Sequence, residues 1–190
     1  NAVSVGYAEE LKTPLGGHGL HESYKARKEV FSGILNGCEY EVWNTANDPY
    51  LTCNYDLGNL SGKIECKTAL QAEMGLPGAP EVPLIGIVSR LTGQKGFDFS
   101  IPAIAKILSE KVQFAILGSG ERWIVEEIAR LSEMNPEQLK FHDGYSEPLA
   151  HRIEAGSDFF LMPSLYEPCG LNQMYSLRYG TLPIVRAVGG

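Results

Sequence analysis

The chain has 190 residues, of which 44% are hydrophobic and 21% charged, so it can bury the core of an ordinary globular domain. Asp and Glu outnumber Lys and Arg by 23 to 16, and the resulting charge of −7 excludes a protein that binds nucleic acid through a broadly basic surface. The longest apolar runs fall far short of the roughly 20 residues of a transmembrane helix, so no membrane contact is expected. The 4 cysteines form no CxxC pair, which indicates reduced thiols rather than disulfides.

The first third of the chain has an irregular pattern. Residues 3–11 predict a strand that runs into a helix, residues 21–28 a short helix, and residues 30–35 a strand. Residues 37–58 form a long loop rich in Asn, Asp and aromatic side chains. A loop longer than about 15 residues is more often functional or a crossing between domains than a simple connection.

Two further segments lead into the second half of the chain. Residues 60–74 predict a helix that begins at a cap on Ser61. Residues 75–83 are rich in Pro and Gly, which predicts a hinge or linker.

From residue 82 onward, short apolar runs alternate regularly with helical patterns. Strands that are apolar throughout and separated by helices are typical of a parallel sheet covered on both faces. The sequence therefore predicts an α/β domain with a doubly wound parallel sheet. Its expected strands cover residues 82–88, 112–117, 138–142, 159–162 and 182–185, and its expected helices cover residues 97–108, 123–134, 149–155 and 171–179.

The loops that follow the strands hold the first candidate residues, because open parallel sheets bind ligands at the carboxyl ends of their strands. Residues 89–96 place Arg90 and Lys95 in a glycine-containing loop, where two cations can clamp a pyrophosphate and neutralise a departing diphosphate. The spacing agrees equally well with the alternative that Arg90 and Lys95 are two solvated surface cations. Residues 118–121 lack the full GxGxxG pattern, so a tight turn is favoured there and a nicotinamide cofactor is not expected.

The segment from Tyr166 to Asn172 is the most informative. Pro168 suits the first position of a helix, which predicts Glu167 at the cap and leaves the amides of Gly170, Leu171 and Asn172 free to hold a phosphate. The Glu167 carboxylate either accepts sugar hydroxyls or merely caps its own helix.

Other side chains with possible chemistry carry weaker signals. Tyr145 lies in a loop where its ring either stacks on a base or covers the core. Cys169 is interpreted as a packing residue, because no neighbouring His would activate its thiol. The 4 histidines have no metal-binding spacing, so no metal ion is expected.

Several blocks together resemble the bacterial glycogen synthases and plant starch synthases. They are residues 12–20, 33–37, 89–96 and 163–190, and their order and spacing agree with that family. Most specific is Glu-Pro-Cys-Gly-Leu at 167–171, followed by Leu-Arg-Tyr-Gly-Thr-Leu-Pro-Ile-Val-Arg at 177–186. Small departures are Tyr175 in place of a second Glu, Asn172 in place of Thr, and Cys-Glu in place of Ile-Asp at 38–39.

The resemblance implies a Rossmann-like domain that is one half of a GT-B fold. Its implied activity is a retaining transfer of glucose from ADP-glucose or UDP-glucose to the non-reducing end of an α-1,4-glucan, without a metal ion or other cofactor. By the family's motifs, Arg90 and Lys95 bind the diphosphate, Glu167 binds the donor sugar's hydroxyls and Asn36 faces the glucose or acceptor. The same motifs assign substrate contacts to Tyr145, Cys169, Gly170, Leu171 and Asn172.

The resemblance also implies a division into domains. Residues 1–12 are expected to end an amino-terminal domain and to cross into a nucleotide-sugar-binding domain over residues 13–190, which is incomplete at its end. The expected partners are the nucleotide sugar, the glucan and the missing amino-terminal domain, and the expected location is the bacterial cytoplasm or the plastid stroma. Without that domain we expect no turnover, since catalysis needs groups from both sides of a closed cleft. The alternative function is a non-catalytic module that binds nucleotide or glucan.

Overall fold

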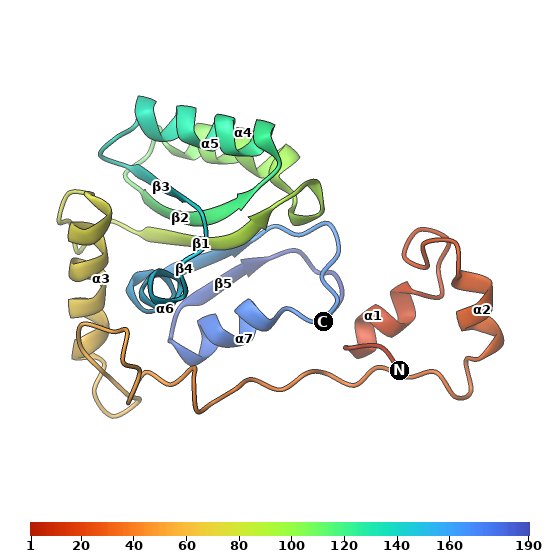
Figure 1. The fold of residues 1–190 in the computed structure, drawn as a ribbon. Coiled ribbons are helices and arrows are strands. Elements are labelled where there is room, and N and C mark those ends of the chain that lie inside the picture. Colours follow the sequence, from red (N-terminus) through yellow and green to blue (C-terminus); the bar gives the residue numbers. More distant parts are fainter.

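A computed structural model describes residues 1–190, and its centre is a five-stranded sheet in which all neighbouring strands are parallel (Figure 1). In the strand order β3-β2-β1-β4-β5, β2 and β3 lie on one side of β1, and β4 and β5 lie on its other side. This arrangement confirms the doubly wound α/β prediction. The carboxyl ends of all strands therefore meet at one edge. The strands are β1 (Leu84–Leu91), β2 (Gln113–Gly120), β3 (Leu139–Asp143), β4 (Phe159–Met162) and β5 (Leu182–Val185).

Helices cover both faces of the sheet, as the continuous apolar strands predict. The helices α4 (Phe97–Ile107) and α5 (Arg122–Met134) pack on one face, and α3 (Ser61–Met74), α6 (Glu147–Gly156) and α7 (Leu171–Arg178) lie on the other (Figure 1). All of these strands and helices were predicted from the sequence, with shifts of only a few residues at their ends. None of the helices has the length and apolar content that crossing a bilayer requires.

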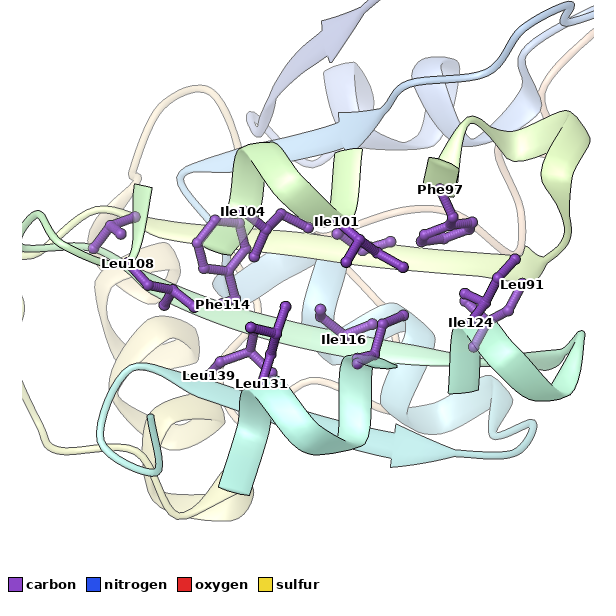
Figure 2. Close-up of a cluster of buried hydrophobic side chains, with 13 residues drawn as sticks. Leu91, Phe97, Ile101, Ile104, Leu108, Phe114, Ile116, Ile124, Leu131 and Leu139 are labelled. Carbon is purple, nitrogen blue, oxygen red and sulfur yellow. The ribbon is translucent and has the colours of Figure 1, made fainter. Parts of the chain in front are cut away.

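The larger core cluster lies between the sheet and the pair α4 and α5 (Figure 2). Phe114 and Ile116 of β2 and Ile104 of α4 are almost fully buried, and Ile124 closes the cluster from α5. Burial of each such side chain contributes about 1.5–3 kcal/mol to folding. Phe97 extends this cluster to the point where the chain leaves the loop after β1, so the core fixes the base of that loop.

The first 33 residues form a small unit, here called the N-terminal module, that lies beside the carboxyl edge of the sheet (Figure 1). Its helices are α1 (Val5–Glu10) and α2 (His21–Ala26), and Ala2, Ala8 and Leu11 form its core. The expected strands at its two ends are wrong. Only a single bridge, between Ala2 and Gly33, joins the two segments, so neither forms a strand. The apolar side chain of Val30 is 82% exposed and packs against no neighbouring strand.

The long loop over residues 37–58 contains turns and one isolated bridge but no helix or strand, as predicted. Trp43 stacks between the rings of His151 and Tyr175, at centroid distances of 3.8 and 3.9 Å. Asp48 is buried, with Oδ2 2.7 Å from His151 Nδ1, and the hydroxyl of Tyr179 donates to the same oxygen. The loop therefore ties α6 and α7 together.

The helix α3 begins at the predicted residue, but the expected cap is wrong. Ser61 is the first helical residue, and the preceding Leu60 makes no side-chain cap. The Asn59 side chain instead accepts a hydrogen bond from the Ser61 amide at 3.0 Å, because Asn59 lies outside the helix where its oxygen can reach that donor.

The segment over residues 75–83 connects α3 to β1 without regular structure, as a linker does. Lys67 Nζ donates to the carbonyls of Pro80 and Val82 and to Asp158 Oδ2, at 2.7–2.9 Å. These bonds tie the segment to α3 and to the residue before β4, and the choice between a hinge and a linker stays a prediction.

Candidate functional site

A pocket of about 630 Å³ opens at the carboxyl edge of the sheet, between the loops that follow β1, β2, β3 and β4. The fold thus brings together residues that are far apart in the sequence, at the edge where such sheets bind ligands. The predicted site residues that line the pocket are Arg90, Lys95, Tyr145, Glu167, Cys169, Gly170, Leu171 and Asn172.

Asn36 is the one predicted site residue that does not line this pocket. It is exposed and lies in the extended segment between the N-terminal module and the long loop. Its role toward the glucose or the acceptor stays a prediction.

The loop after β1 is built around a tight turn. Residues Gly93–Lys95 form a short 3-10 helix, and Gly96 ends it with φ +77°. A Cβ at Gly96 would overlap the carbonyl oxygen of Pro163, so this turn packs directly on the loop after β4. Leu165 N donates to the carbonyl of Gln94 at 2.8 Å, and together these contacts hold the two loops side by side.

Glu121 anchors the same turn from the end of β2. Its carboxylate accepts hydrogen bonds from the Gly93 amide at 2.9 Å and from the Trp123 indole at 3.0 Å. These two donors lower the pKa of Glu121 below its ordinary value. The sequence placed Glu121 in a candidate loop but gave it no role, and its position directly after Gly-Ser-Gly was the available signal.

The two principal candidates of the pocket form an ion pair. Lys95 Nζ lies 2.7 Å from Glu167 Oε2, and the same oxygen accepts a hydrogen bond from Ser164 Oγ at 2.8 Å. The side chains of Lys95 and Glu167 are only 20% and 16% exposed, so their charges are shielded from bulk water. Ser164 was not predicted, since its only signal was its place in the loop between β4 and α7.

Arg90 provides the second cation of the pocket. Its side chain is exposed and makes no hydrogen bond or ion pair with the protein. Its guanidinium can therefore form two parallel hydrogen bonds to a phosphate without first breaking an internal contact. The pocket thus has one paired and one unpaired cation.

The expected capping role of Glu167 is wrong. The helix α7 starts at Leu171 and its cap position is Gly170, which has φ +81°. Because glycine readily adopts this left-handed conformation, the chain turns between Pro168 and the helix, and the Glu167 carboxylate points to Lys95 instead. Pro168 consequently lies outside α7 rather than at its first position.

The start of α7 still offers free donors to the pocket. The amides of Gly170, Leu171 and Asn172 donate to no acceptor within the protein. Unpaired amides at the positive end of a helix favour an anion such as a phosphate. The three amides are therefore free, as the sequence predicts, although the helix begins later than expected.

The remaining pocket residues differ in how free their side chains are. Asn172 Nδ2 donates to the Val88 carbonyl at 3.0 Å, so this side chain links α7 to β1 and presents mainly its backbone to the pocket. Cys169 is a buried residue with a free thiol. Tyr145 is 85% exposed and makes no side-chain hydrogen bond, which leaves its ring open for stacking.

Metal ligation has no basis in the arrangement of side chains. No group of three or more His, Cys, Asp or Glu side chains is placed to hold a metal ion. The groups of this pocket that can neutralise an anionic ligand are Arg90, Lys95 and the helix amides.

The parallel sheet, with a pocket at its carboxyl edge lined by Arg90, Lys95 and the start of α7, defines an α/β domain of the doubly wound class. The family model described as "Glycosyl transferases group 1" matches residues 82–190, and the chain belongs to this family. The whole chain is 52% identical to a glycogen synthase of Aeromonas hydrophila and spans 39% of that protein. It is 45% identical, over 99% of its length, to a soluble starch synthase 1 of Solanum tuberosum, described as chloroplastic/amyloplastic, and spans 29% of that protein.

Comparison of structures gives the same relationship. The catalytic domain of starch synthase IV from Arabidopsis thaliana, solved with ADP and acarbose, superposes with a TM-score of 0.94 and 40% identity. The match covers 100% of this chain and 39% of that one. The GT-B prediction and the resemblance to glycogen and starch synthases are thereby confirmed, and the chain spans between 29% and 39% of these three proteins.

Proposed function

We propose that this chain is the nucleotide-sugar-binding part of a retaining glucosyltransferase that extends an α-1,4-glucan at its non-reducing end. The proposed donor is ADP-glucose, with UDP-glucose as the competing donor. The identities of about 50% to glycogen synthases, and the ADP in the related starch synthase IV structure, support this choice.

One observation carries the proposal. The Lys95–Glu167 ion pair lies in the same pocket as the unpaired guanidinium of Arg90 and the free amides at the start of α7. Such a pocket can hold a diphosphate between Arg90 and the amides while a carboxylate remains within reach of sugar hydroxyls. A site for a simple anion would not need the carboxylate, which would repel it.

Each pocket residue then has a role toward the donor. Arg90 and Lys95 neutralise the charge that develops on the diphosphate when its bond to the anomeric carbon breaks. Glu167 orients the sugar through its hydroxyls, and Tyr145 packs on the base. The backbone around Cys169, Gly170, Leu171 and Asn172 contacts the sugar or the distal phosphate. Outside the pocket, Asn36 faces the glucose or the acceptor.

The acceptor side of the reaction is assigned to a part of the protein outside this chain. The chain spans 39% of its glycogen synthase relative, so we place the glucan-binding groups in an amino-terminal domain. Residues 1–12 belong to the crossing between the two domains in this proposal. The location is the bacterial cytoplasm or the plastid stroma, after the sources of the two relatives.

Glucose transfer by the full-length protein that contains this chain tests the proposal. Lys95→Ala should reduce kcat by about two orders of magnitude with ADP-glucose and a maltooligosaccharide, since loss of one such electrostatic donor costs about 3 kcal/mol. Lys106→Ala removes an exposed cation of α4 that does not line the pocket, and it should retain full activity. An unchanged kcat in Lys95→Ala would refute the assigned role.

A second function remains as an alternative, namely a non-catalytic module that binds nucleotide or glucan. The fold and the pocket are compatible with it, because binding needs only this half of the site. The same assay separates the two functions: a full-length protein that binds ADP but transfers no glucose is a module.

A further inference from the structure

The loop that carries Glu167 is held by both ends of the chain. Ser4 Oγ donates a hydrogen bond to the carbonyl of Pro168 at 2.7 Å, across a sequence separation of 164 residues. The amide of Gly190 donates to the carbonyl of Glu167 at 3.1 Å. In Figure 1 the C-terminus lies next to α1, at the edge where the strands of the sheet end.

Three glycines make this contact possible. A Cβ at Gly6 of α1 would overlap the carbonyl oxygen of Gly189, and a Cβ at Gly189 would overlap that of Glu167. A Cβ at Gly190 would overlap the carbonyl oxygen of Cys169. Backbone therefore packs on backbone in three layers, from α1 through Gly189 and Gly190 to the loop of Glu167.

Further contacts hold Gly189 and the residue before Glu167 against the N-terminal module. Gly189 has φ +66°, a conformation that favours glycine, and its amide donates to Glu10 Oε1 at 2.7 Å. The ring of His18 lies edge-on to the ring of Tyr166, with a centroid distance of 5.5 Å. The N-terminal module thus contacts both the C-terminal glycines and the residue before Glu167.

We propose that α1 and the Gly189–Gly190 pair form a clamp that sets the position of Glu167, and that Ser4 and Gly6 are positioning residues for the donor sugar. This inference rests on the proposed function, in which Glu167 contacts the sugar. The clamp bonds the carbonyls of Glu167 and Pro168, and so fixes the two peptide planes that follow the Glu167 Cα. A misplacement of about 1 Å at such a position is enough to weaken a precisely oriented contact.

The clamp acts most directly on Glu167. Arg90 lies at the end of β1 and Tyr145 in the loop after β3, and neither makes a hydrogen bond with the clamp. A disturbed clamp should therefore leave the contacts of Arg90 and Tyr145 in place and displace the Glu167 carboxylate. The affinity for ADP-glucose should fall more than the affinity for ADP.

Gly6→Ala tests the clamp without weakening the helix that carries it. Alanine favours a helix more than glycine does, so the substitution by itself stabilises α1. Its methyl group, however, cannot fit beside the carbonyl of Gly189, and it should push the C-terminal glycines away. Val5→Ala changes an exposed neighbour in the same helix and is the matched control.

Ser4 offers a second and independent pair of variants. Its hydroxyl caps α1 by accepting from Tyr7 N at 3.0 Å while it donates to Pro168. Ser4→Asp keeps an acceptor for the cap but has no proton to donate, so it should break only the clamp. Ser4→Thr keeps both functions and should behave as the native chain.

The first measurement is calorimetric titration of the chain with ADP and with ADP-glucose. Gly6→Ala and Ser4→Asp should each lower the affinity for ADP-glucose by about tenfold and change the affinity for ADP by less than about threefold. The controls Val5→Ala and Ser4→Thr should change neither affinity. Equal losses for both ligands, or no loss for ADP-glucose, would overturn the clamp.

A second measurement needs no nucleotide. Amide hydrogen exchange of Gly190 should accelerate by about tenfold in Gly6→Ala, because its bond to the Glu167 carbonyl is lost, while the amide of Leu165, bonded to Gln94, stays protected. Unchanged exchange at Gly190 would overturn the clamp. If the native chain binds neither ligand, the proposed function fails, and the exchange data still decide whether the clamp exists.

Discussion

Lys95 Nζ and Glu167 Oε2 lie 2.7 Å apart, although 72 residues separate them in the chain. The pair joins the loop after β1 to the loop after β4, and Ser164 holds the same carboxylate oxygen. This arrangement makes the charge of Lys95 depend on what else enters the pocket. A bound diphosphate competes with Glu167 for the same cation.

Glu167→Gln should raise the affinity for ADP alone by about threefold to tenfold. The amide keeps the size and the acceptor for Ser164, but it no longer places a negative charge beside Lys95 and the phosphates. Calorimetric titration measures the change, with Glu110→Gln, an exposed carboxylate outside the pocket, as control. A lower affinity for ADP would mean that the carboxylate helps to hold the nucleotide.

Gly96→Ala should destabilise the chain by about 2 kcal/mol or more and weaken nucleotide binding. The left-handed φ at Gly96 and the overlap with the Pro163 carbonyl both oppose a side chain at this position. Gly93→Ala is the control in the same turn, since its Cβ would meet only Asp98 Oδ1 at 3.9 Å. Urea unfolding should therefore separate the two variants, and similar midpoints would show that the turn tolerates displacement.

Stability should decrease as the pH rises above about 4.5, because of Glu154. Burial raises the pKa of this carboxyl well above its ordinary value, although Ser176 donates to it and Lys63 lies nearby. The folded state therefore keeps a proton that the unfolded chain releases, and the free energy of unfolding falls by about 1.4 kcal/mol per pH unit until Glu154 ionises in the fold.

Glu154→Gln should remove this part of the pH dependence. Its side-chain oxygen still accepts from Ser176, so the variant should become more stable than the native chain as the pH is raised from 5 toward 8. Thermal unfolding at both pH values measures the difference. Parallel curves for the two proteins would show that Glu154 ionises in the folded state as it does in the unfolded one.

Asp48→Asn should cost about 2–3 kcal/mol of folding free energy. Burial by itself would raise the pKa of Asp48, but hydrogen bonds from His151, Tyr179 and the Tyr50 amide outweigh it and the pKa is lowered. An amide in place of this fully buried carboxylate leaves donors unsatisfied and frees the long loop from α6 and α7. Asp143→Asn, at an exposed site without a side-chain bond, is the control in the same urea titration.

Most of the fold was predictable because its central strands β1 and β2 are apolar and largely buried. The strands β1, β2, β4 and β5 contain short apolar runs, and the helices α4 and α5 have the period of an amphipathic face. The strand expected over residues 30–35 failed for a related reason. Its apolar residues Val30 and Ile34 face solvent, so a local pattern alone did not reveal that no strand lies beside them.

The sequence predicted most of the residues that gather at the pocket, with Asn36 as an exception, but it did not predict their contacts. The strand ends identified the loops of Arg90, Lys95 and Glu167, since topology alone places them at one edge. The capping role of Glu167 was wrong because the helix starts only after Gly170, which has a positive φ. The sequence alone does not show which glycine takes this conformation. The bond between Asp48 and His151 spans 103 residues and was likewise invisible before the fold was known.

Calorimetric titration of the chain with ADP, compared with Arg90→Ala and Arg27→Ala, tests most directly whether this pocket binds the nucleotide. Arg27 is an exposed arginine of the N-terminal module that does not line the pocket. The account predicts saturable binding that Arg90→Ala weakens by about tenfold or more and that Arg27→Ala leaves unchanged. Binding that is indifferent to Arg90, or no binding by the native chain, would contradict it.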